Sequence, residues 1–516
     1  MLKLSALLPS FLLALMPVAA AIHSPERVES GLLSGLAGDA PVMIFKGVPF
    51  AAPPVGDLRW RAPRPPAAWQ GVRKAGQFAA NCMQEMKESQ GPWTSEYQPH
   101  GPVSEDCLYL NVWTAANSAN DKRPVLVYLP GGAFTGGSGD VPVYDGENLA
   151  KKGLVVVTIN YRLGIFGFFT HPELSKESDQ HSSGNYGLLD QVAALEWVKR
   201  NIAAFGGDPK RVTIMGQSAG ASSVHYLLAS PLAKGLFACA IADSGSNMRP
   251  GPGGGLAQSE QSGVQFAQMN GAASLAELRA LPATRLMPQT GGRGPAFRPI
   301  VDGWFLPKDV DEIFAKGEQS DVPTLTGWTA DEGSSGATYG KAPAEQFRSQ
   351  VRQRRGTLAD AFLKLYPAST EEEASVSQKA MAREQSMMET YLWAMNRAKT
   401  SKTTVYTYLF DHPQPGPDKD RYLVFHSSEL PYVFDSLSHA DRPWTPEDRK
   451  IAETMSAYWV NFIKTGNPNG KGLPEWPAFS PENATTMELG DKTMPRPIAD
   501  QSKVDLFKQV YASNIR

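Results

Sequence analysis

The chain has 516 residues, of which 42% are hydrophobic, and this composition is typical of a folded globular protein rather than a disordered one. Its formal net charge is -2, which gives no electrostatic case for a nucleic acid or an anionic membrane surface as a partner. The 47 glycines and 41 prolines predict many turns between regular elements.

The first 21 residues have the pattern of a cleaved secretory signal. Lys3 supplies a positive charge, the stretch from Leu7 to Val18 is mostly apolar, and three alanines end the segment with small residues suited to cleavage. The apolar stretch is shorter than the roughly 20 residues of a membrane-spanning helix, and two prolines interrupt it. We expect a signal peptide at 1–21, a mature chain from about Ile22 without a stable membrane span, and a secreted or periplasmic location.

The chain has three cysteines, Cys82, Cys107 and Cys239. An exported protein meets oxidising conditions, so one disulfide and one free thiol are the simplest arrangement. Three cysteines without clustered histidines make a poor zinc site.

Apolar runs and one helical pattern alternate between about residues 124 and 246. The runs are nearly continuous, which is typical of parallel strands buried on both faces of a sheet. Residues 188–202 show helical spacing, and the segment 206–209 (Gly-Gly-Asp-Pro) is expected to end that helix. This order predicts an α/β fold with a large, mostly parallel sheet. The predicted strands are Val125–Leu129, Leu154–Ile159, Val212–Met215, Ala238–Ala242, Pro323–Trp328 and Thr404–Phe410.

Two later stretches do not fit the alternation of strand and helix. Residues 247–294 are rich in glycine and glutamine, and residues 342–400 look helical with arginine, glutamate and methionine. We interpret both as helical insertions that cover the carboxyl edge of the sheet. No convincing linker separates them, so residues 22–516 are expected to form a single domain.

One G-x-S-x-G pentapeptide, from Gly216 to Gly220, carries Ser218 at its centre. A predicted strand precedes it, and the small residues that follow lead into a predicted helix, which is the context of a nucleophile elbow. The sharp turn exposes the serine hydroxyl, and amides at the start of the helix face a developing oxyanion. We therefore interpret Ser218 as a nucleophile.

A serine needs a base, and in this type of elbow the chain order is serine, acid, histidine. His225 lies in the helix that Ser218 begins and is too near to turn back. His412 lies in a proline-rich turn and His439 among polar residues, so both are interpreted as solvated surface side chains. His426 follows an apolar run and is the favoured base.

The acid of such a triad is expected after a strand between the serine and the histidine. The predicted strand that ends at Trp328 is followed by Asp331 and Glu332, and spacing does not choose between these two carboxylates. Asp302 is a weaker rival, because it lies in a turn that an aspartate can simply cap.

These segments together resemble the type-B carboxylesterases, a family that includes cholinesterases and bacterial para-nitrobenzyl esterases. The similarity extends from about Phe45 to Phe479 and implies an α/β-hydrolase fold. The segments that carry it are Phe45–Ala51, Glu105–Val112, Asn160–Gly164, Gly184–Gln191, Gly216–Gly220, Asp331–Gly333 and His426 with Glu429–Phe434.

The resemblance implies a triad of Ser218, Glu332 and His426, because the family uses the glutamate of the Asp-Glu-Gly segment. It implies a serine carboxylester hydrolase that acts on a small-molecule ester through an acyl-enzyme, without a metal or another cofactor. A peptidase or amidase on the same fold, a lipase and a non-catalytic adhesion module are the alternatives, and the intact triad weighs against the last.

The resemblance also assigns backbone donors and a disulfide. The family's oxyanion amides match Gly132, Ala133 and Ala219, and its early disulfide matches Cys82 with Cys107. Cys239 has no matching partner and falls on a predicted buried strand, where a cysteine is usually an apolar filler. Two structural ion pairs are implied, Arg59 with Glu105 and Arg162 with Asp190.

Two residues depart from the family pattern. Pro130 stands where the glycine loop of carboxylesterases often begins with histidine, and Gln217 replaces the glutamate that often precedes the serine. The second change removes a negative charge beside the nucleophile and weakens the analogy to cholinesterases. Trp93 lies in the segment where cholinesterases carry a choline-binding tryptophan, although its spacing from Cys107 differs.

Overall fold

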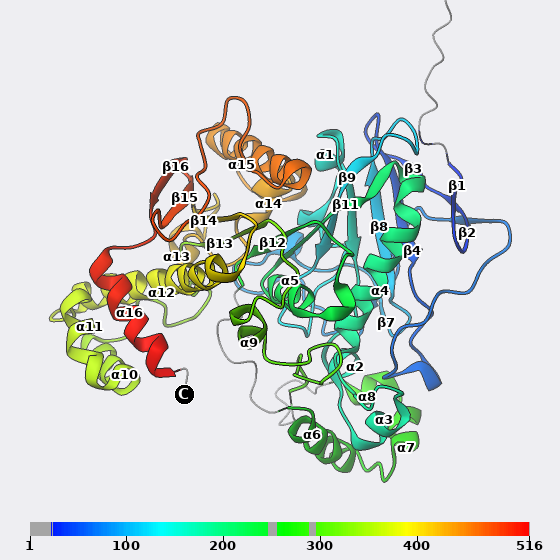
Figure 1. The fold of residues 1–516 in the computed structure, drawn as a ribbon, viewed down its shortest axis with the longest axis horizontal. Helices are drawn as coiled ribbons and strands as arrows, with labels where there is room; N and C mark the ends of the chain where they lie inside the picture. Colours follow the sequence, from blue (N-terminus) through cyan, green and yellow to red (C-terminus); the bar gives the residue numbers. More distant parts are fainter. Residues whose placement is uncertain (1–21, 23, 246–254, 288–295, 515–516) are drawn as a thin grey trace, which may run out of the picture.

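The computed structural model describes residues 22, 24–245, 255–287 and 296–514. The predicted signal peptide at 1–21 lies outside the described residues. Within them, an eleven-stranded sheet runs through the middle of the molecule in the order β16-β15-β14-β13-β12-β11-β9-β10-β8-β4-β3 (Figure 1). Its strands are β3 (Leu36–Ala37), β4 (Met43–Pro49), β8 (Tyr109–Thr114), β9 (Arg123–Leu129), β10 (Val155–Ile159), β11 (Gly207–Gln217), β12 (Cys239–Asp243), β13 (Thr324–Thr329), β14 (Val405–Asp411), β15 (Thr485–Gly490) and β16 (Met494–Pro497).

Smaller elements surround this sheet. A three-stranded sheet and a two-stranded sheet are formed by β1 (Glu26–Val28), β2 (Gly31–Ser34), β5 (Val72–Lys74), β6 (Asn81–Cys82) and β7 (Val103–Ser104). The helices are α1 (Glu147–Lys151), α2 (Gly164–Phe168), α3 (Pro172–Glu177), α4 (Tyr186–Asn201), α5 (Ala219–Ala229), α6 (Leu256–Met269), α7 (Leu275–Ala280), α8 (Ala283–Leu286), α9 (Val310–Ala315), α10 (Ala344–Arg355), α11 (Ala359–Leu365), α12 (Glu371–Thr400), α13 (Lys419–Tyr422), α14 (Leu430–Val433), α15 (Pro446–Thr465) and α16 (Gln501–Asn514).

The predicted α/β fold is confirmed. The six predicted strands correspond to β9 through β14, and all of their pairings with one another are parallel. Antiparallel pairs occur only toward the two ends of the described sheet, at β8, β4 and β3 on one side and at β16 on the other. Every residue of β10 and β12 is buried, which explains their continuous apolar sequence.

The predicted helix at 188–202 corresponds to α4, which ends at Asn201. Gly206 follows a short 3-10 turn with a φ of 75°, a conformation that glycine adopts without steric cost, and the chain then enters β11. The described part of the first insertion forms α6, α7 and α8, and the second forms α10, α11 and α12. Figure 1 shows α10 and α11 near the C-terminal helix α16, beyond the β14–β16 end of the sheet.

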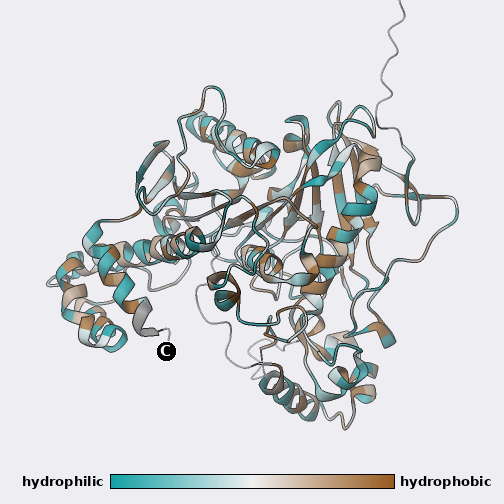
Figure 2. Ribbon diagram, viewed as in Figure 1, coloured by the Kyte–Doolittle hydropathy of each residue, from teal (hydrophilic) through white to brown (hydrophobic). Residues whose placement is uncertain are grey.

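Hydrophobic residues concentrate on the central strands, whereas the outer helices expose hydrophilic faces (Figure 2). The core includes five tryptophans that are less than 2% exposed: Trp60, Trp113, Trp197, Trp459 and Trp476. In the part of the chain that the structure describes, no helix has both the length and the apolar character needed to cross a membrane.

The covalent and ionic contacts implied by the resemblance are present. Cys82 and Cys107 form a disulfide, and Cys239 is a buried free thiol on β12. Both ion pairs that the resemblance implies are also formed. They join Arg59 Nε to Glu105 Oε1 at 2.6 Å and Arg162 Nη2 to Asp190 Oδ1 at 2.7 Å.

Candidate active site

Ser218 lies in a strained turn between β11 and α5. Its φ of 58° and ψ of -121° place a non-glycine residue in a region that side chains rarely adopt. The turn can close only because Gly216 and Gly220, two residues to either side of Ser218, have no side chains. A Cβ on Gly216 would lie 2.3 Å from the carbonyl of Gly220, and one on Gly220 would lie 2.0 Å from the carbonyl oxygen of Leu129. This geometry is that of the predicted nucleophile elbow, and it leaves Ser218 partly exposed.

The glycine loop after β9 faces this turn. Gly132 has a φ of 116° and Ala133 a φ of 56°, and a Cβ on Gly132 would lie 2.2 Å from the carbonyl oxygen of Gly136. Among the described residues, no acceptor takes the backbone N–H groups of Gly132, Ala133 or Ala219. Ala219 begins α5, so its N–H also has no partner within the helix. These three donors are free to bind a negatively charged oxygen beside Ser218.

His426, in the segment between α13 and α14, meets Glu332, in the loop that follows β13. His426 Nδ1 contacts Glu332 Oε2 in a short hydrogen bond, and the backbone N–H of Thr329 donates to Glu332 Oε1 at 2.9 Å. Burial by itself would raise the pKa of Glu332. The charge of His426 and the hydrogen bonds that Glu332 accepts outweigh burial and hold that pKa below its ordinary value. Glu332 is therefore an anion when it faces the imidazole.

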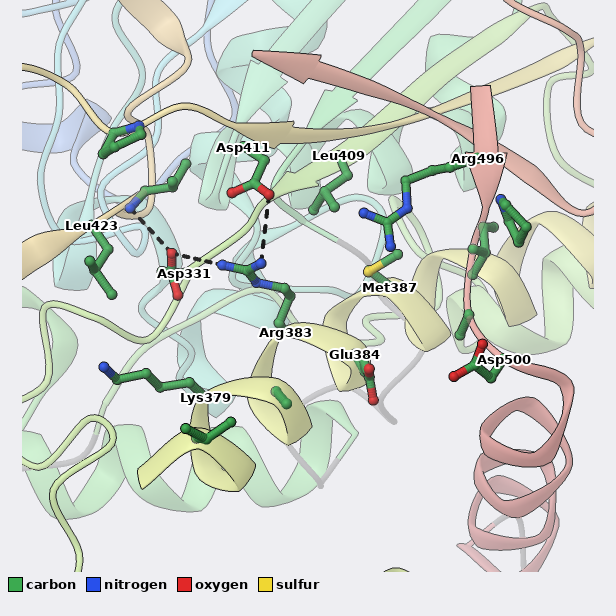
Figure 3. Close-up of a pocket in the computed structure, with 17 residues that line it drawn as sticks. Asp331, Lys379, Arg383, Glu384, Met387, Leu409, Asp411, Leu423, Arg496 and Asp500 are labelled. Atoms are coloured by element: carbon green, nitrogen blue, oxygen red, sulfur yellow. Dashed lines mark hydrogen bonds and ion pairs between the residues drawn. The ribbon is translucent and has the colours of Figure 1, made fainter. Parts of the chain in front are cut away.

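Asp331, the neighbouring carboxylate, has different partners. It is 2% exposed and accepts hydrogen bonds from Tyr339 Oη at 2.8 Å, Arg383 Nη2 at 3.2 Å and the backbone N–H of Val424 at 3.3 Å. Figure 3 shows Arg383 between Asp331 and Asp411, whose carboxylate lies 3.6 Å from the guanidinium. Asp331 thus fastens the loop of Glu332 to the segment that precedes His426.

The imidazole of His426 has two further neighbours, Gln217 and Trp93. Gln217 Nε2 lies 3.1 Å from His426 Nε2 and 3.4 Å from Nδ1, so the amide lies over the face of the ring. Within the described hydrogen bonds, the hydroxyl of Ser218 has no contact with Nε2. The indole N–H of Trp93 donates to the carbonyl oxygen of His426 at 2.9 Å. Gln217 therefore contacts the imidazole and Trp93 holds the backbone of His426, and only the position of Gln217 next to Ser218 was a local signal for such a role.

The other candidate bases are bound elsewhere. His225 is buried on α5, its Nε2 contacts the carbonyl oxygen of Gly245 at 3.1 Å, and burial lowers its pKa to about 4. The expectation that His412 is a solvated surface residue is wrong. It is 8% exposed and lies between Asp448 and Asp491, which reach it from later segments. His439 is exposed, as expected.

Asp302, the weaker rival acid, caps a turn. Its Oδ1 accepts hydrogen bonds from the backbone N–H groups of Trp304 and Leu306, at 3.2 Å and 2.8 Å. In the described ranges of the chain, no group of three or more His, Cys, Asp or Glu side chains is arranged to hold a metal ion.

A pair of buried carboxyl groups lies behind the Glu332 loop. Asp243 and Glu429 are both fully buried, and Asp243 accepts a hydrogen bond from Tyr408 Oη at 2.9 Å. Burial raises the pKa of Asp243 to about 7. Burial, with the nearby charges of Asp243 and Glu332, raises the pKa of Glu429 well above its ordinary value.

Two cavities meet at Ser218. The first, here called the histidine-side cavity, has a volume of about 560 Å³ and is lined by residues that include Trp93, Gly132, Gln217, Ser218, Met287 and His426. The second, here called the arginine-side cavity, has a volume of about 530 Å³ and is lined by residues that include Ala133, Ser218, Ala219, Arg298, Glu332 and Gln385. The cavity of about 620 Å³ around Asp331 and Arg383 includes none of Ser218, Glu332 and His426 in its lining (Figure 3).

Comparisons with known proteins agree with this architecture. A family model described as the carboxylesterase family matches residues 27–507. The fumonisin B1 esterase of Sphingopyxis macrogoltabida is 39% identical over 488 residues, which cover 90% of this chain and 86% of that protein. The para-nitrobenzyl esterase of Bacillus subtilis (strain 168) is 36% identical over 473 residues, covering 86% of this chain and 90% of that protein.

A solved structure of PNB esterase has the same fold. It superimposes with a TM-score of 0.78 and 32% identity, and the match covers 94% of this chain and 99% of the other. The chain therefore belongs to the carboxylesterase family and is a hydrolase of carboxylic esters.

Proposed function

We propose that the chain cleaves small-molecule carboxylic esters through an acyl-enzyme on Ser218, with His426 as the base and Glu332 as the acid. The contact between His426 Nδ1 and Glu332 Oε2, beside a serine held in a nucleophile elbow, carries this proposal. Because Ser218 and His426 line the same cavity, a bound ester can reach both side chains.

In the proposed reaction, His426 Nε2 removes the proton of Ser218 while the serine oxygen bonds to the ester carbonyl carbon. The amides of Gly132, Ala133 and Ala219 bind the resulting oxyanion. The carbon–oxygen bond to the alcohol then breaks, and the alcohol leaves with the proton held by His426. Water repeats these steps on the acyl-enzyme, which releases the acid and restores the serine hydroxyl.

Glu332 and Gln217 contact different parts of the imidazole. Glu332 holds the Nδ1–H tautomer and stabilises the imidazolium that forms when Nε2 takes the serine proton. The Gln217 amide lies over the face of the ring, so the in-plane lone pair of Nε2 stays open to the serine hydroxyl. The steps themselves use only protein groups and water.

The decisive experiment replaces the nucleophile. Ser218→Ala should lower kcat for p-nitrophenyl esters by several orders of magnitude, because the members of a triad act as a unit. A fluorophosphonate probe should label Ser218 in the active enzyme, and labelling of a different serine would contradict the assignment. Matched p-nitrophenyl ester and anilide substrates separate an esterase from an amidase, and the proposal requires the ester to react much faster.

The N-terminal sequence supports a further proposal, that the protein is exported with residues 1–21 removed and residues 22–516 acting as one catalytic domain. Expression in a bacterial host with a periplasm tests it. N-terminal sequencing of the exported protein should find a start near Ile22. Retention of the full leader on cytoplasmic protein would contradict export.

A further inference from the structure

Arg298 brings a positive charge to the arginine-side cavity that the proposed triad does not use. Its side chain is exposed, and Nη1 donates to the carbonyl oxygen of Ala133 at 3.2 Å. In the part of the chain that the structure describes, no carboxylate lies within ion-pair distance of this guanidinium. Since Ala133 belongs to the glycine loop, the charge lies next to the backbone that faces the reacting carbonyl.

The position of His426 assigns the two cavities to the two halves of an ester, if the proposed mechanism holds. The proton that His426 takes from Ser218 must reach the departing alcohol, so the alcohol occupies the cavity that His426 lines. The arginine-side cavity contains Ser218 and Ala219 but not His426. It is therefore the place for the acyl group.

The carboxylates that line the arginine-side cavity are already engaged. Glu332 binds His426, and Glu389 is only 6% exposed and accepts a hydrogen bond from Gln385 Nε2 at 3.4 Å. Arg298, by contrast, is exposed, and the hydrogen bond it donates goes to the neutral backbone carbonyl of Ala133. An anion that enters this cavity gains the charge of Arg298 without displacing a carboxylate of the protein.

We propose that Arg298 selects esters whose acyl group carries a free carboxylate, which are the monoesters of dicarboxylic or polycarboxylic acids. The planar guanidinium presents two parallel N–H donors that match the two oxygens of a carboxylate. Because Arg298 lies beside Ala133, the substrate carboxylate that it binds lies further along the acyl chain than the reacting carbonyl. This carboxylate is on the side of Ser218 away from the leaving alcohol. This inference rests on the proposed function and names the substrate class of the same site.

The test compares two esters of one chain length that differ only in charge. p-Nitrophenyl hemiadipate carries a free carboxylate, and its methyl-capped form, methyl p-nitrophenyl adipate, is neutral. Release of p-nitrophenol gives kcat/KM for each. In the wild type the anionic ester should be favoured, and in Arg298→Gln the ratio of anionic to neutral kcat/KM should fall about tenfold to a hundredfold, the effect of one charged hydrogen-bonding partner.

Three controls make the outcome specific. Arg298→Lys keeps the positive charge but lacks the paired N–H donors of a guanidinium, so it should retain part of the preference. Arg285 is an exposed arginine on α8, and Arg285→Gln should keep the wild-type ratio. High salt should shrink the preference wherever position 298 keeps its positive charge, and should leave the ratio of Arg298→Gln unchanged. A wild-type ratio of one or less, or an unchanged ratio in Arg298→Gln, would overturn this inference. Hydrolysis of both esters by Ser218→Ala would instead overturn the proposed triad.

Discussion

The side-chain amide of Gln217 lies over the imidazole ring of His426, within reach of both ring nitrogens. The distance between Gln217 Nε2 and His426 Nε2 is 3.1 Å, and Gln217 is 2% exposed, so water does not compete for the contact. With Nδ1 bound to Glu332, the imidazole is fixed at one edge by Glu332 and covered on one face by Gln217. A neutral amide at this position adds no charge to the base, unlike the glutamate of many relatives.

Replacing this amide with a carboxylate should change how activity depends on pH. In Gln217→Glu the added negative charge favours the protonated imidazolium of His426, so the acidic limb of the kcat/KM profile should move to higher pH. Gln217→Met is the neutral control of similar length and should keep the wild-type limb. Profiles measured with one p-nitrophenyl ester decide the matter, and an unshifted limb in Gln217→Glu would contradict the contact.

The two adjacent carboxylates should fail in different ways. Glu332→Gln should lower kcat by about 10³-fold to 10⁴-fold at nearly constant Tm, because it removes the group that fixes the histidine tautomer. Asp331→Asn should mainly lower Tm, because Asp331 is buried against Tyr339 and Arg383. Steady-state kinetics and thermal unfolding of both variants distinguish these outcomes. Equal losses of kcat would show that the carboxylates are misassigned.

Trp93→Phe should slow the reaction without weakening substrate binding. Phenylalanine keeps most of the packing but lacks the N–H that binds the carbonyl oxygen of His426. We expect kcat to fall by about tenfold, the effect of one lost hydrogen bond, with little change in KM. Kinetics with a small neutral ester test this. A rise in KM alone would indicate that Trp93 contacts substrate rather than positioning the histidine.

Asp243 should make the folded state less stable as pH rises. Its pKa is about 7 in the folded protein, so between about pH 4 and pH 7 the folded state holds a proton that the unfolded state has lost. Stability from this group is therefore lost across that window, by up to about 4 kcal/mol, since one pKa unit corresponds to about 1.4 kcal/mol.

Asp243→Asn should remove this dependence, because an amide still accepts from Tyr408 and does not ionise. Urea unfolding of wild type and variant near pH 5 and near pH 8 measures it, and the difference in unfolding free energy should grow with pH in favour of the variant. A difference that stays constant would show that Asp243 is ionised in the folded protein.

The central strands were predictable because burial on both faces requires continuous apolar sequence, as in β10 and β12. The antiparallel strands β4 and β8 were not. β4 changes register with β8 between Phe45 and Val48, and β8 carries Asn111, whose amide is satisfied by Gly139 and Thr158. Buried polar residues of this kind depend on partners that local sequence does not reveal.

The same limit applies to the site. Ser218 was identifiable because its flanking glycines and strand are local. Spacing left Asp331 and Glu332 equivalent, since their partners Val424 and His426 lie more than 90 residues further along the chain. His412 was misread for this reason as well, because the aspartates that bury it belong to later segments.

The meeting of the two cavities at Ser218 means that the halves of a substrate separate on opposite sides of the serine. In the proposed mechanism, the histidine-side cavity is vacant once the alcohol has left, while the acyl group is still attached, and His426 then activates whatever hydroxyl enters that cavity. Water is only one such acceptor. An added short alcohol would compete with it, and the enzyme would then make a new ester instead of a free acid, in a proportion set by the two concentrations.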